Sequence, residues 1–236
     1  MKITVSPKEN SLLASLTAAS YERLLPDIEP VYLRTGRNLT LPDDPMNHAY
    51  FPVDAIVSLL SAVTEGDETE IAMIGYEGVV GTPLFMGCIS MPNRALIQHG
   101  GRALRISALR LNEEFSRHES LHVTLLRYTQ TLMRQSDQIA ACNRHHSTEQ
   151  NLCRWLLMIT DRIELQPLSV TQEWIANTLG VRRERIAKAA GNLQRLGIIC
   201  YQRGHISVLD KVQLCRQCCN CYQSVQLVND RSTRFQ

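Results

Sequence analysis

Four basic side chains crowd the start of one predicted helix in the last third of the chain. Arg182, Arg183 and Arg185 lie close together, Lys188 follows one helical turn later, and Glu184 is the acidic residue among them. Arginine can donate two hydrogen bonds to a guanine edge, glutamate can accept one from a cytosine amino group, and lysine can reach a purine acceptor or a phosphate. These residue types at this spacing therefore predict nucleic-acid recognition.

The residues around this basic group predict a helix-turn-helix. Residues 171–196, TQEWIANTLGVRRERIAKAAGNLQRL, place apolar side chains at helical spacing before and after Gly180. Gly180 can adopt the left-handed backbone conformation that a tight turn needs, and Ala176 is small enough for close helix packing. Thr171 is expected to cap the first helix. The side chains expected to face inward are Ile175, Ala176, Leu179, Val181, Ile186 and Ala189.

A β-hairpin is predicted directly after the second helix. Residues 198–209 contain two apolar runs separated by Arg203, Gly204 and His205, which are suited to a turn between strands. A hairpin in this position is a wing, and Arg203 and His205 at its tip are candidate phosphate contacts. The alternative is that both side chains only solvate the turn.

The distribution of charge along the chain also supports nucleic-acid recognition by the predicted helix-turn-helix. The whole chain has a formal net charge of +2. Residues 1–107 hold 8 basic and 12 acidic side chains, residues 108–168 hold 7 of each, and residues 169–211 hold 7 basic and 3 acidic. Positive charge is thus concentrated on the predicted helix-turn-helix, as attraction to phosphates requires.

The composition indicates a folded protein of one large or two ordinary domains. The chain has 236 residues, of which 44% are hydrophobic. The sequence shows no secretory signal and no apolar run of membrane-spanning length. Eight cysteines in such a chain are expected to be reduced thiols, and the expected location is the cytoplasm.

The elements before the basic segment follow two patterns. Residues 11–25 predict one or two short helices that end at Pro26, and residues 31–106 predict short strands separated by Gly, Pro, Asp and Asn clusters. Such strands favour a small β-barrel or sandwich. Helical patterns return at residues 107–118 and 147–163. The predicted fold class is therefore α+β.

A long helix is predicted over residues 119–143. Residues spaced alternately four and three apart form a coiled-coil seam over about three heptads, which predicts a two-fold dimer. The alternative is a helix that packs on its own domain, because Leu126 and Met133 broaden the apolar face. The predicted dimerisation residues are Leu121, Leu125, Tyr128, Leu132, Gln135, Ile139 and Cys142.

In the order of these elements the chain resembles the Crp/Fnr family of bacterial transcription regulators. The stretches HAYFPVDAIVSLL, IGYEGVVGTPLFMG and, most specifically, VTQEWIANTLGVRRERIAKAAGNLQRLGII carry the resemblance, which covers nearly the whole chain. It implies a cyclic-nucleotide-binding-like β-roll at residues 1–118, a dimerisation helix at 119–146 and a winged helix-turn-helix at 147–236. It also implies a cytoplasmic homodimer that binds a roughly palindromic double-stranded DNA site and has RNA polymerase as a partner.

The resemblance also implies roles for individual residues. The family's recognition helix usually opens with a Ser-Arg-Glu type of sequence and has a basic residue one turn later, and Arg183, Glu184 and Lys188 fall on those positions. Arg182 stands where the family typically has a capping Ser or Thr, so we expect it to meet a phosphate instead. The predicted DNA-binding residues are Thr171, Arg182, Arg183, Glu184, Arg185, Lys188, Arg203 and His205.

The family's cyclic-nucleotide contacts are not matched. Thr82 stands where nucleotide-binding members have a glutamate, and their Arg-Ser pair falls on Met91 and Pro92. Arg94 could replace the arginine only with a gap, and Ala95 would still supply no hydroxyl. A cyclic phosphate needs a positive charge and donors, so cyclic AMP is not expected as the effector. No iron-sulfur cluster is expected either, because the family's iron-sulfur members use cysteines near the N-terminus.

A cluster of thiols supports a second hypothesis, a thiol- or metal-responsive regulator. The sequence CRQCCNC at residues 215–221 has a density of thiols that could bind a metal or form a redox switch. These thiols are Cys215, Cys218, Cys219 and Cys221. The alternative, which we favour, is a helix over residues 212–228 that packs its cysteines as small hydrophobic residues. The apolar stripe of that helix would be Leu214, Cys215, Cys218, Tyr222 and Val225.

No enzymatic function is expected. None of the seven histidines lies in a nucleophile or metal-ligand motif, and no catalytic constellation is found. A remaining alternative is a dimeric effector-binding module without DNA readout, which duplex binding that is independent of salt would favour.

Overall fold

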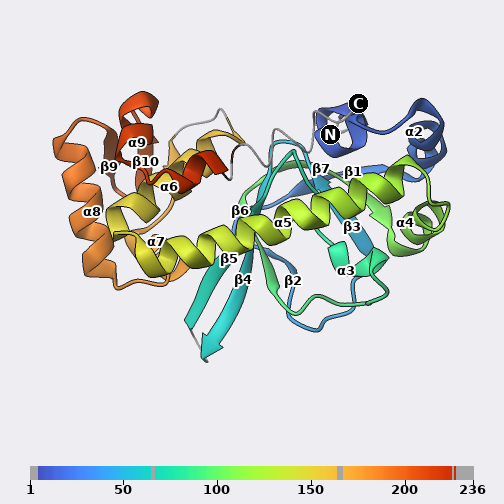
Figure 1. Cartoon of the computed structure of the whole chain (residues 1–236), viewed down its shortest axis with the longest axis horizontal. Helices are drawn as coiled ribbons and strands as arrows, with labels where there is room; N and C mark the ends of the chain where they lie inside the picture. Colours follow the sequence, from blue (N-terminus) through green and yellow to red (C-terminus); the bar gives the residue numbers. More distant parts are fainter. Residues whose placement is uncertain (1–4, 65–66, 164–166, 225, 227–236) are drawn as a thin grey trace. The chain divides into compact units, whose positions relative to one another are not determined.

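The computed structural model describes residues 5–64, 67–163, 167–224 and 226. Contacts divide them into two compact units. Of the described residues, the first unit comprises 5–59 and 72–135, and the second comprises 60–64, 67–71 and those from 136 onward. The long helix α5 (Ser120–His145) contributes to both (Figure 1).

The predicted short strands form two sheets, which confirms the β-roll. A three-stranded sheet has the order β1-β7-β3, and a four-stranded sheet has the order β2-β6-β4-β5. Both neighbours of β7 run antiparallel to it, with Val31 opposite Ala103 and Phe51 opposite Leu104. Up to residue 107 the elements are η1 (Pro7–Glu9), α1 (Ser11–Ala14), α2 (Ala18–Leu24), η2 (Leu25–Asp27), β1 (Glu29–Leu33), β2 (Asn38–Thr40), β3 (His48–Pro52), β4 (Ile56–Thr64), β5 (Asp67–Ile74), α3 (Thr82–Phe85), β6 (Arg94–His99) and β7 (Gly101–Ser107).

The N-terminal helices are tied to the β-roll through a buried asparagine. The Asn10 side chain caps α1 by accepting from the backbone N–H groups of Leu12 and Leu13. Its amide group donates to the carbonyl oxygens of Pro52 at 2.8 Å and Gly78 at 3.0 Å. Asn10 is fully buried, so these four bonds satisfy the polar group that burial removes from water.

An ion pair joins α2 to α4 (Ala108–Phe115). Nε of Arg23 donates to the two carboxylate oxygens of Glu114 at 3.1 and 3.0 Å, and Nη2 also reaches Glu119. The Glu114 side chain is only 6% exposed. The hydrogen bonds from Arg23 lower the pKa of Glu114 from its ordinary value, against the opposing effect of burial.

The second unit contains the winged helix-turn-helix that the sequence predicts. Its small sheet has the order β8-β10-β9. Buried Trp155 contacts half-buried Trp174, with ring centroids 5.7 Å apart. The elements after α5 are α6 (Thr148–Thr160), β8 (Leu168–Ser169), α7 (Gln172–Thr178), α8 (Arg183–Arg195), β9 (Ile199–Gln202), β10 (His205–Val208) and α9 (Lys211–Gln217).

The helix predicted over residues 212–228 is shorter than expected. α9 ends at Gln217, because Cys218 adopts an extended backbone conformation with φ −75° and ψ 159°. A separate helical turn follows at residues 221–224. Leu214 and Tyr222 are buried as predicted, whereas Cys215 is exposed. Val225 of the predicted stripe lies outside the described residues. Among the described helices, none combines the length and apolarity needed to cross a membrane.

Candidate nucleic-acid interface

The two helices of the predicted motif are α7 and α8, and local features fix the turn between them. Thr171 caps α7, with its side chain accepting from the Trp174 N–H at 3.1 Å. Gly180 has φ +63°, the left-handed conformation that its position was predicted to require. The backbone N–H of Val181 donates to the Ala176 carbonyl at 2.9 Å. The predicted inward residues that are buried are Ile175, Ala176, Leu179, Ile186 and Ala189.

The start of α8 has no side-chain cap. Arg182 occupies the N-cap position with extended backbone angles, and its side chain makes no capping hydrogen bond. A missing cap costs about 1 kcal/mol and leaves backbone N–H groups at the helix start available. The first residues of α8 therefore present both N–H donors and arginine side chains to an anion.

The outward face of α8 carries the residues predicted to read bases. Ile186, Ala189, Ala190 and Leu193 form the buried stripe, and the exposed residues opposite to it follow at gaps of three and four. Arg183 and Arg185 flank this exposed row. In the described part of the chain, no salt bridge involves the basic residues of the first two turns. The exposed row consists of Glu184, Lys188, Gly191 and Arg195.

Gly191 is a member of this face that our sequence analysis did not single out. It lies in the middle of α8, where glycine destabilises a helix by about 1 kcal/mol relative to alanine. A Cβ atom added at Gly191 would have no atom within 4 Å, so packing within the described chain does not require glycine. Its position opposite the buried stripe could have identified it from the sequence.

The wing is a tight hairpin at the same surface. Arg203 and Gly204 have φ values of 50° and 78°, and two successive left-handed residues are typical of a type I′ turn. The Val170 N–H donates to the Gly204 carbonyl at 2.8 Å, and the Tyr201 hydroxyl donates to the Val170 carbonyl at 3.0 Å. These bonds hold the tip against the segment that precedes α7.

A shallow cavity of about 290 Å³ brings predicted residues from three elements together. Thr171, Arg183 and Arg203 all line it, beside Tyr201 and Gly204. Burial raises the pKa of Tyr201, and the positive charge of Arg183 opposes this effect. Tyr201 is a second residue that the sequence analysis missed. The cap of α7, the start of α8 and the wing tip thus form one surface with two cationic side chains.

The predicted dimerisation seam requires a correction. Leu121, Leu125, Tyr128, Gln135, Ile139 and Cys142 are buried within the chain itself, and Leu132 is half-buried. Tyr128 packs against Gly78 so closely that no Cβ would fit there, and Gln135 accepts from the Met73 N–H at 2.6 Å. The described seam residues therefore serve the fold of one chain, and the alternative of a helix packed on its own domain holds for this stripe.

A different stripe of α5 is open. Val123, Leu126 and Met133 are 41%, 47% and 62% exposed. The exposed positions 123, 126, 130, 133, 137 and 140 follow at alternating gaps of three and four, which is the heptad spacing of a coiled-coil seam.

Thr82, Met91 and Pro92, the positions that the family resemblance aligns with cyclic-nucleotide contacts, all lie in the first unit. Thr82 is buried at the first position of α3, and Met91 is buried with 2% of its surface exposed. Pro92 is exposed and has no N–H to donate. The Arg94 Nη1 donates to the Asn38 side-chain oxygen at 3.0 Å. None of Thr82, Met91 and Pro92 offers a charge that could hold a cyclic phosphate.

The four thiols of residues 215–221 do not form a single cluster. Cys219 and Cys221 lie beside Cys142 and His146, whereas Cys215 and Cys218 are not part of that group. Burial raises the pKa of Cys142 to about 12, which outweighs the opposing effects of Gln138 and Arg154. Burial also raises the pKa of Cys218. The thiolate is the reactive form of cysteine, and burial disfavours that form at both positions.

Comparisons with known proteins agree with this arrangement. Residues 150–217 match the family model of the Crp-like helix-turn-helix domain. No curated protein sequence matches the chain. FixK2 from Bradyrhizobium japonicum has a similar solved structure, with a TM-score of 0.68, 15% sequence identity, and coverage of 81% of this chain and 98% of that one.

Two other similar structures are regulators by their descriptions. The c-di-GMP responsive global regulator CLP from Xanthomonas campestris has a TM-score of 0.64 and 18% identity, and the match covers 82% of this chain and 100% of CLP. A Crp/Fnr transcriptional regulator from Thermus thermophilus, TTHA1359, has a TM-score of 0.64 and 18% identity, with coverage of 80% and 97%. The resemblance to Crp/Fnr transcription regulators is thus confirmed: the chain carries a Crp-like helix-turn-helix domain and has the fold of solved regulators of that family.

Proposed function

We propose that this chain is a transcription regulator that binds double-stranded DNA as a homodimer, with α8 of each protomer in the major groove of one half of a roughly palindromic site. The observation that carries this proposal is the exposed face of α8. Glu184 and Lys188 project from this face and Arg183 flanks it, all three without salt bridges among the described residues, although exposed Arg and Glu side chains elsewhere in the chain pair readily.

The residues of this surface divide into two roles. Arg183, Glu184 and Lys188 stand at the start of α8, the part of a recognition helix that reaches base edges. Arg203 at the wing tip, with the uncapped start of α8, suits the phosphate backbone that flanks the groove. The residues assigned to the backbone are Thr171, Arg182, Arg185, Arg203 and His205.

The partner in the dimer is a second copy held along the open stripe of α5. Val123, Leu126 and Met133 supply the apolar contacts, at the heptad spacing that two parallel helices require. Burial of such exposed apolar groups is the main favourable contribution to association. The two-fold symmetry of this contact matches the palindromic symmetry of the site.

DNA binding in this proposal does not require cyclic AMP. Thr82, Met91 and Pro92 offer neither a carboxylate for a ribose hydroxyl nor a cation for a cyclic phosphate. Addition of cyclic AMP is therefore expected to leave the affinity for the selected site unchanged. A cytoplasmic location and contact with RNA polymerase complete the proposal.

The experiment that tests the proposal is selection of bound sequences from a random duplex pool with the full-length protein. We expect an inverted repeat whose half-site centres are about 10 bp, or a multiple of one helical turn, apart. Arg183→Ala is expected to abolish the preference at one position of each half-site, at a cost of about 1–3 kcal/mol per position. A pool that shows no enriched sequence, or a unique half-site without a repeat, contradicts dimeric readout.

A further inference from the structure

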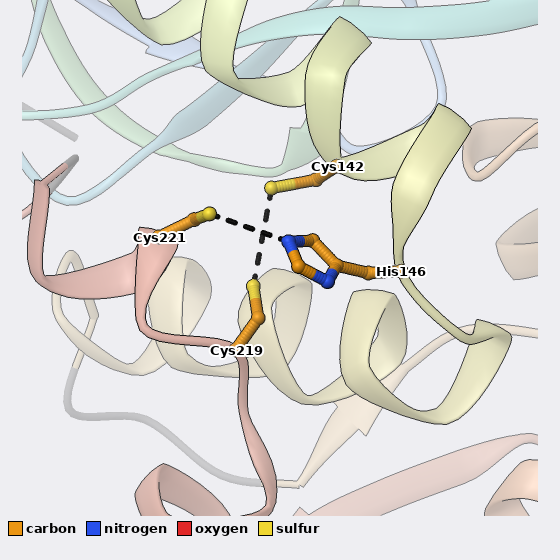
Figure 2. Close-up of side chains that lie close together, drawn as sticks. All are labelled: Cys142, His146, Cys219 and Cys221. Atoms are coloured by element: carbon orange, nitrogen blue, oxygen red, sulfur yellow. Dashed lines mark hydrogen bonds between the residues drawn. The ribbon is translucent and has the colours of Figure 1, made fainter.

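Three thiols and one imidazole converge between the end of α5 and the segment that follows α9 (Figure 2). Cys142 and His146 lie four residues apart, and the His146 N–H donates to the Cys142 carbonyl at 2.9 Å, so helical spacing places both on one face. Cys219 and Cys221 come from the extended stretch and helical turn beyond α9. All four residues belong to the second compact unit.

The geometry of the group resembles the ligand set of a tetrahedral metal site. The four ligand atoms all lie within 4.8 Å of one another. Sγ of Cys142 is 3.9 Å from Sγ of Cys219, and Nε2 of His146 is 3.3 Å from Sγ of Cys221. Tetrahedral zinc, with bonds of about 2.3 Å to sulfur and about 2.0 Å to nitrogen, places its ligands roughly 3.4–3.8 Å apart. The two pairs cross in Figure 2, as opposite edges of a tetrahedron do.

The types of the four ligand atoms determine which metal ion the group would prefer. Three sulfur ligands and one imidazole, with no carboxylate in the group, form a soft set that favours Zn²⁺ over Mg²⁺ or Ca²⁺. Four protein ligands also close the coordination sphere, which is typical of a structural zinc site. The Gln138 amide donates to Sγ of Cys142 at 3.4 Å, a hydrogen bond of the kind that supports a thiolate ligand.

A buried cation beside the group provides an independent observation. Arg154 is only 2% exposed, and it forms no salt bridge among the described residues. Its Nη1 donates to Met158 Sδ at 3.9 Å and its Nη2 to the side-chain oxygen of Asn143, the neighbour of Cys142, at 3.3 Å, whereas its Nε has no hydrogen-bond partner there. A buried charge needs a counter-charge. Three thiolates and one neutral imidazole around Zn²⁺ carry a net charge of about −1, which would supply it.

We propose that Cys142, His146, Cys219 and Cys221 bind one Zn²⁺ ion in a structural site that ties the chain beyond α9 to the end of α5. Binding replaces the thiol protons of the three cysteines with bonds to the metal, and the protons pass to solvent. The metal would hold two segments together that are separated by more than 70 residues in the sequence. This inference goes beyond the proposed function and does not depend on DNA binding.

The test measures zinc in full-length protein purified under reducing conditions without a histidine tag. We expect about one zinc ion per chain, and near-complete loss of zinc in Cys142→Ser and Cys219→Ser. The matched controls are Cys218→Ser, next to a proposed ligand, and Cys215→Ser, both outside the group, and both should retain the metal. If either control loses as much zinc as Cys219→Ser, the ligand assignment is wrong.

A measurement on the unsubstituted chain decides the question even if a variant fails to fold. Cobalt substitution should give the absorption of a tetrahedral site with thiolate ligands, and zinc should protect Cys221, but not exposed Cys215, from alkylation detected by mass spectrometry. Protein that binds neither metal, or that shows equal alkylation of Cys221 with zinc and with a chelator, refutes the site. A Cys142–Cys219 disulfide in protein isolated under anaerobic, reducing conditions would refute it as well.

Discussion

Replacement of Arg203 at the wing tip should weaken DNA binding by an amount that can be estimated from the proposed phosphate contact. Arg203 is exposed and has φ 50°, and it is followed by Gly204 at φ 78°. Asparagine tolerates this left-handed conformation better than most residues, so Arg203→Asn removes the charge and preserves the hairpin. Thermal stability should be unchanged or slightly higher, and any loss of DNA affinity then reports the missing cation.

The expected loss can be estimated from counterion release. Each phosphate contact contributes about −0.9 to the slope of log K against log salt concentration. A homodimer presents two wings, so Arg203→Asn should make the slope shallower by about 1.8 and weaken binding about 30-fold at about 0.15 M salt, equally for all sequences.

Fluorescence anisotropy with a labelled duplex, at several salt concentrations, measures both quantities. Arg203→Lys is the control, because it keeps the charge at the same backbone position and should keep the slope. An unchanged slope in Arg203→Asn, or a loss confined to one DNA sequence, would refute the assignment of Arg203 to the phosphate backbone.

Three further predictions concern stability and assembly. Gly191→Ala should raise the free energy of unfolding by about 1 kcal/mol, because the added methyl group meets open space in a helix, and urea denaturation that shows no gain would contradict this. The same substitution should weaken DNA binding, because it adds a methyl group to the face of α8 proposed to enter the groove. Leu126→Glu should convert the dimer into a folded monomer, because it places a charge in the open stripe of α5, and sedimentation that still shows a dimer at micromolar concentration excludes this interface. Arg23→Leu should destabilise the protein at neutral pH, where Glu114 is ionised. Because Arg23 lowers the pKa of Glu114 below 4.5 in the folded state, the stability from this pair is present above pH 4.5 and is lost as pH falls through the lowered pKa. The difference in unfolding free energy between the two proteins should therefore shrink in acid, and a difference that stays constant down to about pH 3 would show that Glu114 is not its source.

Local patterns predicted most of the elements, because each depends on neighbouring residues. The spacing of Ile175, Ala176 and Ile186 around Gly180 defines the helix-turn-helix, and Arg203 with Gly204 marks the wing. The absence of a side-chain cap at Arg182 was also predictable. These features need no information about distant parts of the chain.

The face of α5 could not be assigned in this way, because the helix carries two stripes at heptad spacing. The more apolar stripe, which includes Leu121 and Leu125, packs into the chain's own core, whereas the stripe with Leu126 and Met133 remains open. Periodicity locates an apolar stripe but does not say which surface covers it. The stronger stripe buries more apolar area and is the one that the fold of the single chain uses.

Local patterns also could not predict the group of Cys142, His146, Cys219 and Cys221, because its two pairs are far apart in the sequence. The density of cysteines at residues 215–221 predicts a site made of neighbours in the sequence. Of these cysteines only Cys219 and Cys221 belong to the group, and its other members, Cys142 and His146, come from the end of α5 and the residue after it. The only local signal was the helical spacing of Cys142 and His146. The break after α9 at Cys218 brings the two pairs together, and the predicted continuous helix would not have allowed it.

Sequence-specific DNA binding by α8 is tested most directly by comparing the affinity of the full-length protein for its selected site with that for a scrambled duplex over a range of salt concentrations. We expect binding to the selected site to be about 10³-fold tighter or more, with affinity for both duplexes that falls steeply as salt rises. Equal affinity for the two duplexes would contradict sequence readout by α8, and affinity that does not depend on salt would contradict DNA binding by this surface altogether.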